Sequence, residues 1–302
     1  RNWDEAWYAE IMKNMASGQH GFLVPFWNGQ YYFDKPPLYF WLTMPIFKLF
    51  GIGEWQTRIV SVIAVIGTVI LLYATSKKLF SWVAGFFAAV IFLTFGQVYM
   101  RLSHGNLDAL LIFLFLAAFY TYLLSKKNSR FTYLCGICIG LSFLVKGWGL
   151  GLLPIIFIVT YELFTTLTLP KRGFKLLLTI LLVCGWWFIF GIATFGRPFF
   201  DSYVLNPLAG NLTSSFSTDY LSFFARDTGL WWILAGIVIV KYRRQLSALH
   251  FKVLSFLFLV GFSYVFAVNF SYDKLDWYLL PIYPLFALCF GYCASLLVKR
   301  PG

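Results

Sequence analysis

The stretch from Asp108 to Ser125 reads DALLIFLFLAAFYTYLLS, and its only charge is at the first residue. A helix of about 20 such residues crosses the hydrocarbon core of a bilayer. Similar runs recur along the chain, which is 60% hydrophobic and 12% charged, whereas soluble domains carry about 25% charged residues. Helices satisfy their own backbone groups in hydrocarbon. The sequence therefore predicts an all-α, polytopic transmembrane helical bundle and excludes a soluble cytosolic enzyme.

The apolar runs divide the chain into an outer loop and a bundle. Residues 1–54 are polar and aromatic, and residues 55–302 contain about nine expected spans with a long outer loop at 196–228. The spans are expected at 58–76, 79–99, 108–125, 131–145, 148–164, 174–195, 229–243, 251–268 and 277–297. The chain starts at Arg1 without a methionine and ends soon after the last run, so we expect an excerpt of a longer protein, truncated at both ends.

Charge predicts the orientation in the membrane. Most of the Lys and Arg residues lie in five short loops, at 77–78, 126–130, 171–175, 241–252 and 299–300. Short loops rich in Lys and Arg face the cytoplasm. Nearly all of the 12 acidic residues then lie on the outer side, which suggests that carboxylates take part in the chemistry of that side. The net charge of +12 reflects this topology, so we expect no nucleic-acid partner.

The N-terminal segment predicts a juxtamembrane amphipathic helix from Asn2 to Ser17. Its apolar residues form one stripe, consisting of Trp7, Tyr8, Ile11, Met12 and Met15. Asp4 and Glu5 lie at the start of this helix, where the helix dipole stabilises anions. Ionised carboxylates serve as a general base or as ligands of a hard metal ion, but they also serve as ordinary helix caps.

Two further clusters carry charge at expected helix ends. Lys35 precedes Pro36 and Pro37, which stiffen the backbone; its ammonium suits a phosphate or, alternatively, the membrane surface. Asp108 opens its apolar span, where a carboxylate needs a partner or a role unless Asp108 or Asn106 caps the helix.

Three other cations fall on the outer side. Lys274 lies in the acidic turn between the last two spans, which is either a solvated turn or part of a site. Lys146 and Arg58 are expected to be interfacial anchors. Topology places all these groups on one face of the membrane without showing that they converge.

Three segments resemble motifs of the GT-C glycosyltransferases, the superfamily of aminoarabinose lipid A transferases and protein mannosyltransferase-like enzymes. DEAWYAEI at 4–11 and YFDKPPLY at 32–39 are similar to the opening outer loop of that family. Asp108 matches the position of its second acidic motif, and KLDWYLLP at 274–281 is similar to its later motif. The resemblance covers nearly the whole chain.

The resemblance implies a multi-pass enzyme of the cell membrane, by analogy the bacterial inner membrane, with its active site on the periplasmic or extracellular side. Such an enzyme transfers a sugar from a polyprenyl-phosphate carrier in the membrane lipid to a lipid, glycan or protein acceptor, with inversion. Asp4 would be the main catalytic acid, acting as base or as ligand of a divalent metal ion, with Asp108 assisting in either role and Glu5 beside them. The carrier phosphate and sugar would be bound by Lys35, Tyr8, Tyr32, Arg58 and Lys274.

Two departures from the family pattern leave the identities of the sugar and the acceptor open: Trp7 stands where the family usually has Arg, and Asp276 stands where it usually has Pro. Two other functions are alternatives to the glycosyltransferase. A transporter is one alternative, although transporters place charges near the bilayer midplane and only Glu162 comes close to that. A non-catalytic subunit that binds a lipid-linked sugar is the other.

Overall fold

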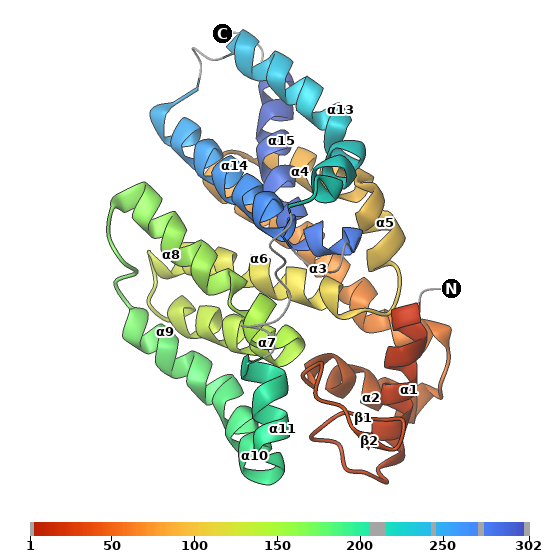
Figure 1. Cartoon of the computed structure of the whole chain (residues 1–302). Coiled ribbons are helices and arrows are strands. Elements are labelled where there is room, and N and C mark those ends of the chain that lie inside the picture. The colour runs from red at the N-terminus through yellow and green to blue at the C-terminus, as the bar shows by residue number, and fades with distance from the viewer. Residues whose placement is uncertain (1–2, 206–215, 243–245, 271–274, 299–302) are drawn as a thin grey trace. The chain divides into compact units, whose positions relative to one another are not determined.

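The computed structural model describes residues 3–205, 216–242, 246–270 and 275–298. Within these residues the chain is almost entirely helical (Figure 1). The helices are α1 (Trp3–Ser17), α2 (Leu38–Phe50), α3 (Glu54–Leu79), α4 (Trp82–Thr94), α5 (Gly96–Leu102), α6 (Leu107–Ser125), α7 (Phe131–Gly151), α8 (Leu153–Thr166), α9 (Gly173–Ile180), η1 (Leu181–Gly185), α10 (Trp186–Phe195), α11 (Arg197–Phe200), η2 (Asp201–Leu205), α13 (Asp219–Tyr242), α14 (Ala248–Val268), η4 (Asp276–Ile282) and α15 (Tyr283–Val298). A two-stranded antiparallel hairpin, β1 (Phe26–Trp27) and β2 (Gln30–Tyr31), follows α1. The all-α, multi-pass prediction is confirmed.

The described helices include seven that are long and apolar enough to cross a membrane. The number becomes eight if α4 and α5, which meet at 67°, form one broken span. The expected span at 148–164 corresponds to α8, which has 14 residues and is shorter than a crossing requires. The span expected to begin at residue 229 is α13, which begins at Asp219, and the first part of the expected loop 196–228 contains α11 and η2.

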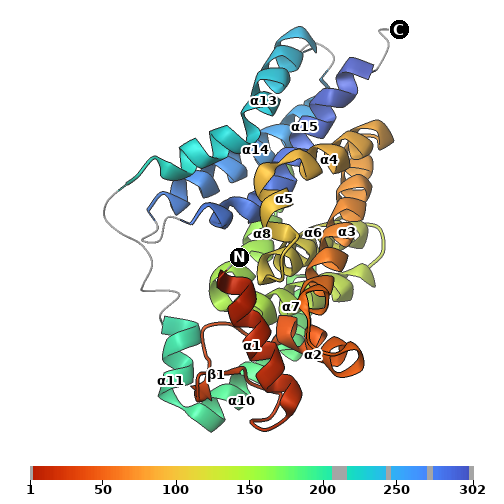
Figure 2. The ribbon, with the colours of Figure 1, turned by 90° about the vertical axis from the view of Figure 1, so that its right-hand side faces the viewer.

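The chain packs as two compact units. Unit 1 consists of Arg1–Ile66, Leu102–Val159 and Leu169–Asn211, and unit 2 consists of Gly67–Arg101, Thr160–Thr168 and Leu212–Gly302. In unit 1, α6 packs along α7, α7 packs along α9, and α1 packs on α2. In unit 2, α15 contacts α4, α13 and α14 (Figure 2). The apolar stretches of α6 and α15 are 78% and 83% buried, so these helices form the centres of their units.

The expected stripe of α1 is the buried face of that helix. Tyr8, Ile11, Met12 and Met15 are all buried, and α1 packs on α2 through this part of unit 1. Trp7 is half-buried at the edge of the stripe. The amphipathic helix predicted from periodicity is therefore confirmed, and it fixes where the acids of its first turn lie.

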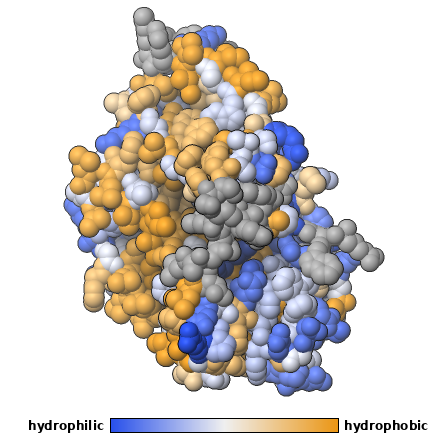
Figure 3. All heavy atoms as spheres, viewed as in Figure 1, coloured by the Kyte–Doolittle hydropathy of each residue, from blue (hydrophilic) through white to orange (hydrophobic). Residues whose placement is uncertain are grey.

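The surface of unit 1 that is formed by α9, η1 and α10 is apolar and exposed. Phe174, Leu182 and Ile189 on α9, η1 and α10 are 79%, 69% and 70% exposed. Figure 3 shows orange residues gathered over this part of the unit and blue residues over the N-terminal segment. Because exposed apolar side chains of this size suit lipid and not water, this face fits the hydrocarbon of a bilayer.

Candidate active site

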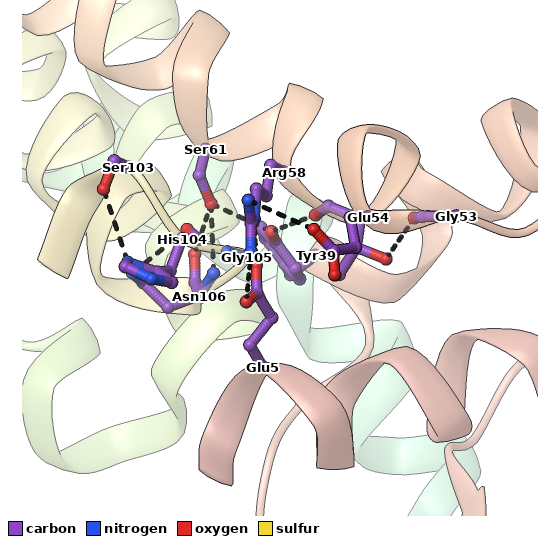
Figure 4. Close-up of polar contacts among 11 residues, drawn as sticks. Glu5, Tyr39, Gly53, Glu54, Arg58, Ser61, Ser103, His104, Gly105 and Asn106 are labelled. Carbon is purple, nitrogen blue, oxygen red and sulfur yellow. Dashed lines mark hydrogen bonds and ion pairs between the residues drawn. The ribbon is translucent and has the colours of Figure 1, made fainter. Parts of the chain in front are cut away.

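Glu5 joins three segments of unit 1 that are far apart in the sequence. Arg58, in the first turns of α3, donates from Nε to Glu5 Oε1 at 2.6 Å and from Nη2 to Oε2 at 2.9 Å. The backbone N–H of Gly105 donates to Glu5 Oε1 at 2.8 Å. Figure 4 shows the Glu5 side chain rising from α1 toward both groups. This arrangement, here called the Glu5 clamp, fixes α1 against the start of α3 and the turn before α6.

The clamp holds Glu5 in its ionised form. Burial raises the pKa of this carboxyl, but the hydrogen bonds from Arg58 and Gly105 and the charges of Arg58 and His104 outweigh that effect. The pKa of Glu5 is therefore below its ordinary value of 4.5. With its oxygens engaged by three strong donors, Glu5 is suited to fixing α1 in place.

The turn before α6 is built from backbone and hydroxyl groups. Asn106 Oδ1 accepts a hydrogen bond from the Ala109 N–H at 3.1 Å, so Asn106 is the N-cap of α6. Ser61 Oγ accepts from the Asn106 N–H at 3.1 Å and donates to the Asn106 carbonyl at 3.0 Å. Asn106 therefore supplies the cap that sequence analysis left open between two residues, and the Asp108 carboxylate is available for another partner.

That partner is Lys146. The Lys146 Nζ lies 3.1 Å from Asp108 Oδ1, and the two side chains are 12% and 9% exposed. Lys146 takes this position just before a break in α7, where Gly147 has φ 65° and ψ −158°. Only glycine adopts such a conformation without strain. Lys146, expected to be an interfacial anchor, is instead half of a buried ion pair.

Lys35 belongs to a second ion pair on the segment before α2. Its Nζ lies 2.7 Å from Asp34 Oδ2, which also accepts a hydrogen bond from the Tyr32 hydroxyl at 2.8 Å. Desolvation raises the pKa of Asp34, but Lys35, Tyr32 and the charge of Lys146 together lower it by more than desolvation raises it. The pKa is therefore below its ordinary value, and the carboxyl is ionised at neutral pH. Because Lys146 acts on Asp34, the two ion pairs lie within electrostatic range of each other.

An aromatic cluster lies beside these charges. The Trp7 ring is 5.1 Å from that of Trp27 and 5.2 Å from that of Tyr32, measured between centroids. Trp7 also stacks on Tyr8 at 6.1 Å. Trp7 therefore fills the position of the family's usual Arg with an apolar ring packed against Tyr32.

The structure places several of the residues singled out from the sequence in two groups of contacts in unit 1. Glu5 meets Arg58, and Lys35 and Asp108 belong to neighbouring ion pairs. Asp4 is half-buried in the first turn of α1, beside the clamp. Lys274 lies outside the described residues.

Sequence reasoning missed the role of two residues. It placed Lys146 on the outer side of the membrane but gave no partner for it. Tyr203, at the start of the expected loop 196–228, drew no attention, yet its hydroxyl donates to the Lys35 carbonyl at 2.8 Å. No signal in the sequence links residues 168 positions apart, and only the fold brings them together.

The resemblance to the family implied that Asp4 and Asp108 could be ligands of a divalent metal ion. Among the described residues, no three His, Cys, Asp or Glu side chains are grouped closely enough to hold an ion. The expected pair of ligands, Asp4 and Asp108, is therefore not part of such a group, and Asp108 is bonded to a lysine.

The chain is similar in sequence to a known family. Residues 34–189, more than half of the chain, match the family profile described as dolichyl-phosphate-mannose-protein mannosyltransferase. The chain belongs to this family. The matched region includes both ion pairs and Arg58, and the similarity to GT-C glycosyltransferases is confirmed.

Solved structures share the fold of this mannosyltransferase family member. The crystal structure of ArnT from Cupriavidus metallidurans bound to undecaprenyl phosphate matches with a TM-score of 0.82 at 20% identity, over 97% of this chain and 56% of that chain. The Archaeoglobus fulgidus oligosaccharyltransferase tethered to an acceptor peptide matches with a TM-score of 0.62 at 14% identity, over 97% and 45%. The fold is of the GT-C type.

One sequence relative of this family member is closer in identity over a shorter region. The undecaprenyl phosphate-alpha-4-amino-4-deoxy-L-arabinose arabinosyl transferase of Pseudomonas savastanoi is 32% identical over 53% of this chain and 31% of its own length. The chain spans 58%, 42% and 31% of the lengths of the first three curated relatives.

Proposed function

We propose that this chain carries the catalytic site of a membrane glycosyltransferase that takes its sugar from a polyprenyl-phosphate carrier. The observation that carries the proposal is the pair of ammonium groups, Lys35 and Lys146, in one cluster at helix ends of unit 1. A departing phosphate needs positive charge that is already in place. Each ammonium pairs with one carboxylate, Lys35 with Asp34 at 2.7 Å and Lys146 with Asp108 at 3.1 Å.

The proposed reaction moves one sugar by displacement at its anomeric carbon. The acceptor oxygen forms a bond to that carbon, and the bond from the carbon to the carrier phosphate oxygen breaks with its electron pair. Asp4 takes the acceptor's proton as general base. Lys35 stabilises the leaving phosphate. Attack from the side opposite the phosphate inverts the anomeric centre.

The remaining residues would hold this arrangement in place. The Glu5 clamp fixes the first turn of α1 and therefore the position of Asp4. Asp108 holds the Lys146 ammonium near Asp34. Tyr8 and Tyr32 line the carrier side of the cluster beside Trp7. Arg58 acts through Glu5, so its contribution to carrier binding is indirect.

The proposed setting is the non-cytoplasmic face of the cell membrane, for which the bacterial inner membrane is the analogous location. The cation-rich loops predict that the helix ends carrying the cluster face away from the cytoplasm. A carrier with an isoprenoid tail reaches such a site from the bilayer. The acceptor is a lipid, a glycan or a protein.

Two substitutions test the proposal in the full-length protein reconstituted into liposomes. With undecaprenyl phosphate carrying a labelled sugar as donor, Asp4→Asn and Lys35→Ala should each abolish transfer, measured by mass spectrometry of lipid and glycan products. Lys13→Ala is the matched control, because Lys13 is an exposed cation on α1 that pairs with the exposed Glu10 on the same helix. Near-wild-type transfer by either test variant would refute the assignment.

The same vesicles separate the alternatives. Solute uptake without sugar transfer would identify a transporter. Binding of the donor without turnover by the wild-type protein, under conditions in which acceptors of all three classes are supplied, would identify a non-catalytic subunit.

A further inference from the structure

Tyr203 makes a long-range contact with the main chain at Lys35, the residue proposed above to bind the carrier phosphate. It lies in η2 and is 2% exposed, and its hydroxyl donates to the carbonyl oxygen of Lys35 at 2.8 Å. The next residue, Pro36, has no N–H, so the backbone there has fewer local hydrogen bonds to hold it. A donor from another part of unit 1 therefore fixes the orientation of this peptide group.

The Tyr203 ring is held firmly. Its centroid lies 4.7 Å from that of Phe199 and 5.3 Å from that of Trp187. A Cβ on Gly147 would lie 3.6 Å from the Tyr203 ring and 3.8 Å from Pro36, so the break in α7 is in contact with both. The ring thus packs against the same turn that places Lys146.

A second hydrogen bond ties the same region to the N-terminal segment. The indole of Trp187, which is fully buried, donates to the Leu23 carbonyl at 2.8 Å. Because two buried donors from 187–203 reach carbonyls in 23–35, the contact of Tyr203 is part of a built interface and not an isolated bond.

The Tyr203 hydroxyl is a permanent donor. Burial, followed by the negative charge of Asp34, raises its pKa well above the ordinary value of 10.0. The group is therefore protonated throughout the physiological range, and its bond to the Lys35 carbonyl does not depend on pH.

We propose that Tyr203 is a positioning residue for carrier binding, acting by fixing the Lys35 backbone so that the ammonium meets the carrier phosphate. This inference rests on the proposed function, since it assumes that Lys35 binds that phosphate. It assigns to Tyr203 an effect on the affinity for a polyprenyl monophosphate that is exerted through Lys35.

Tyr203→Phe is the test, because it keeps the ring and removes only the donor. Loss of one hydrogen bond corresponds to about a 2- to 10-fold change in an equilibrium constant. We expect the Kd of the full-length protein for undecaprenyl phosphate to rise by this factor, while the thermal unfolding temperature falls by about as much as in the control variant below. Tyr292→Phe is the matched control: Tyr292 is equally buried at 2%, its hydroxyl lies 3.0 Å from His250 Nδ1, and it lies in unit 2.

A double-mutant cycle shows whether Tyr203 acts through Lys35. Lys35→Ala removes the ammonium but keeps the carbonyl that Tyr203 binds, so Tyr203→Phe should weaken binding in the wild type and have no added effect in the Lys35→Ala background. An unchanged Kd for Tyr203→Phe, or an equal loss in both backgrounds, would overturn the inference and leave the proposed function standing. An unchanged Kd for Lys35→Ala would instead overturn the proposed function.

Discussion

Replacing Glu5 with Gln should loosen α1 from the rest of unit 1. The carboxylate accepts three hydrogen bonds, at 2.6, 2.9 and 2.8 Å, from Arg58 and the Gly105 N–H. A glutamine of the same shape offers one acceptor oxygen, and its NH2 group then faces a donor. The substitution therefore removes the negative charge and at least one of the three bonds.

The expected loss in the free energy of unfolding depends on two quantities: the strength of hydrogen bonds to a charged group and the solvent exposure of the Glu5 and Arg58 side chains. Such a bond contributes about 1.5–3 kcal/mol. The Glu5 side chain is 15% exposed and that of Arg58 is 34% exposed, so water replaces part of what Arg58 loses. We therefore expect a loss of about 2–3 kcal/mol in the free energy of unfolding, which is well above the value of an exposed pair.

Thermal unfolding of the purified full-length protein measures this effect. The control is Glu10→Gln on the same helix, since Glu10 pairs with Lys13 at 3.3 Å with about half of each side chain exposed. An exposed pair of this kind contributes about 0–1 kcal/mol. A cycle with Arg58→Gln should show strong non-additivity. Equal shifts for Glu5→Gln and Glu10→Gln, or additive effects with Arg58→Gln, would refute the reasoning.

The pH dependence has a definite sign. The folded protein lowers the Glu5 pKa below 4.5, so the unfolded state binds the proton more readily. The clamp's contribution is therefore fully present above the unfolded pKa and is lost as the pH falls through the lower, folded pKa. The difference in stability between wild type and Glu5→Gln should shrink over that acidic range and remain constant near neutrality.

Two further predictions concern the buried pair and the break in α7. Asp108→Ala should destabilise the protein by about 3–5 kcal/mol, because it leaves Lys146 buried without its carboxylate, and combining it with Lys146→Met should restore most of that loss in thermal unfolding. Gly147→Ala should cost about 1–3 kcal/mol through backbone strain alone, because a Cβ meets only ordinary contacts there. Gly173→Ala, in open space without positive φ, should have little effect; equal unfolding temperatures for the two alanine variants would contradict the strain argument.

Local chemistry was enough to predict the helices and some of their faces. The buried stripe of α1 follows from spacing alone, because residues three and four apart share one side of a helix. The run after Asp108 predicts α6 for the same reason, since hydropathy along 19 residues is a property of the segment itself. Span ends were predicted less well where backbone geometry intervened: α7 continues past residue 145 to Gly151, and α13 begins ten residues before the expected span.

The sequence by itself determined that this chain is a helical membrane protein, because hydropathy is a property of each segment and needs no partner. It also predicts that the acids gather on one side of the membrane. Only the tertiary structure decided which acid meets which cation: Glu5 with Arg58, Asp108 with Lys146, and Lys35 with its neighbour Asp34. It also brought the Tyr203 hydroxyl to the backbone carbonyl of Lys35. Those pairings join residues up to 168 positions apart. They depend on helix packing and on the backbone angles of Gly147. Together these bring the polar groups to about 3 Å from each other, the distance at which hydrogen bonds form.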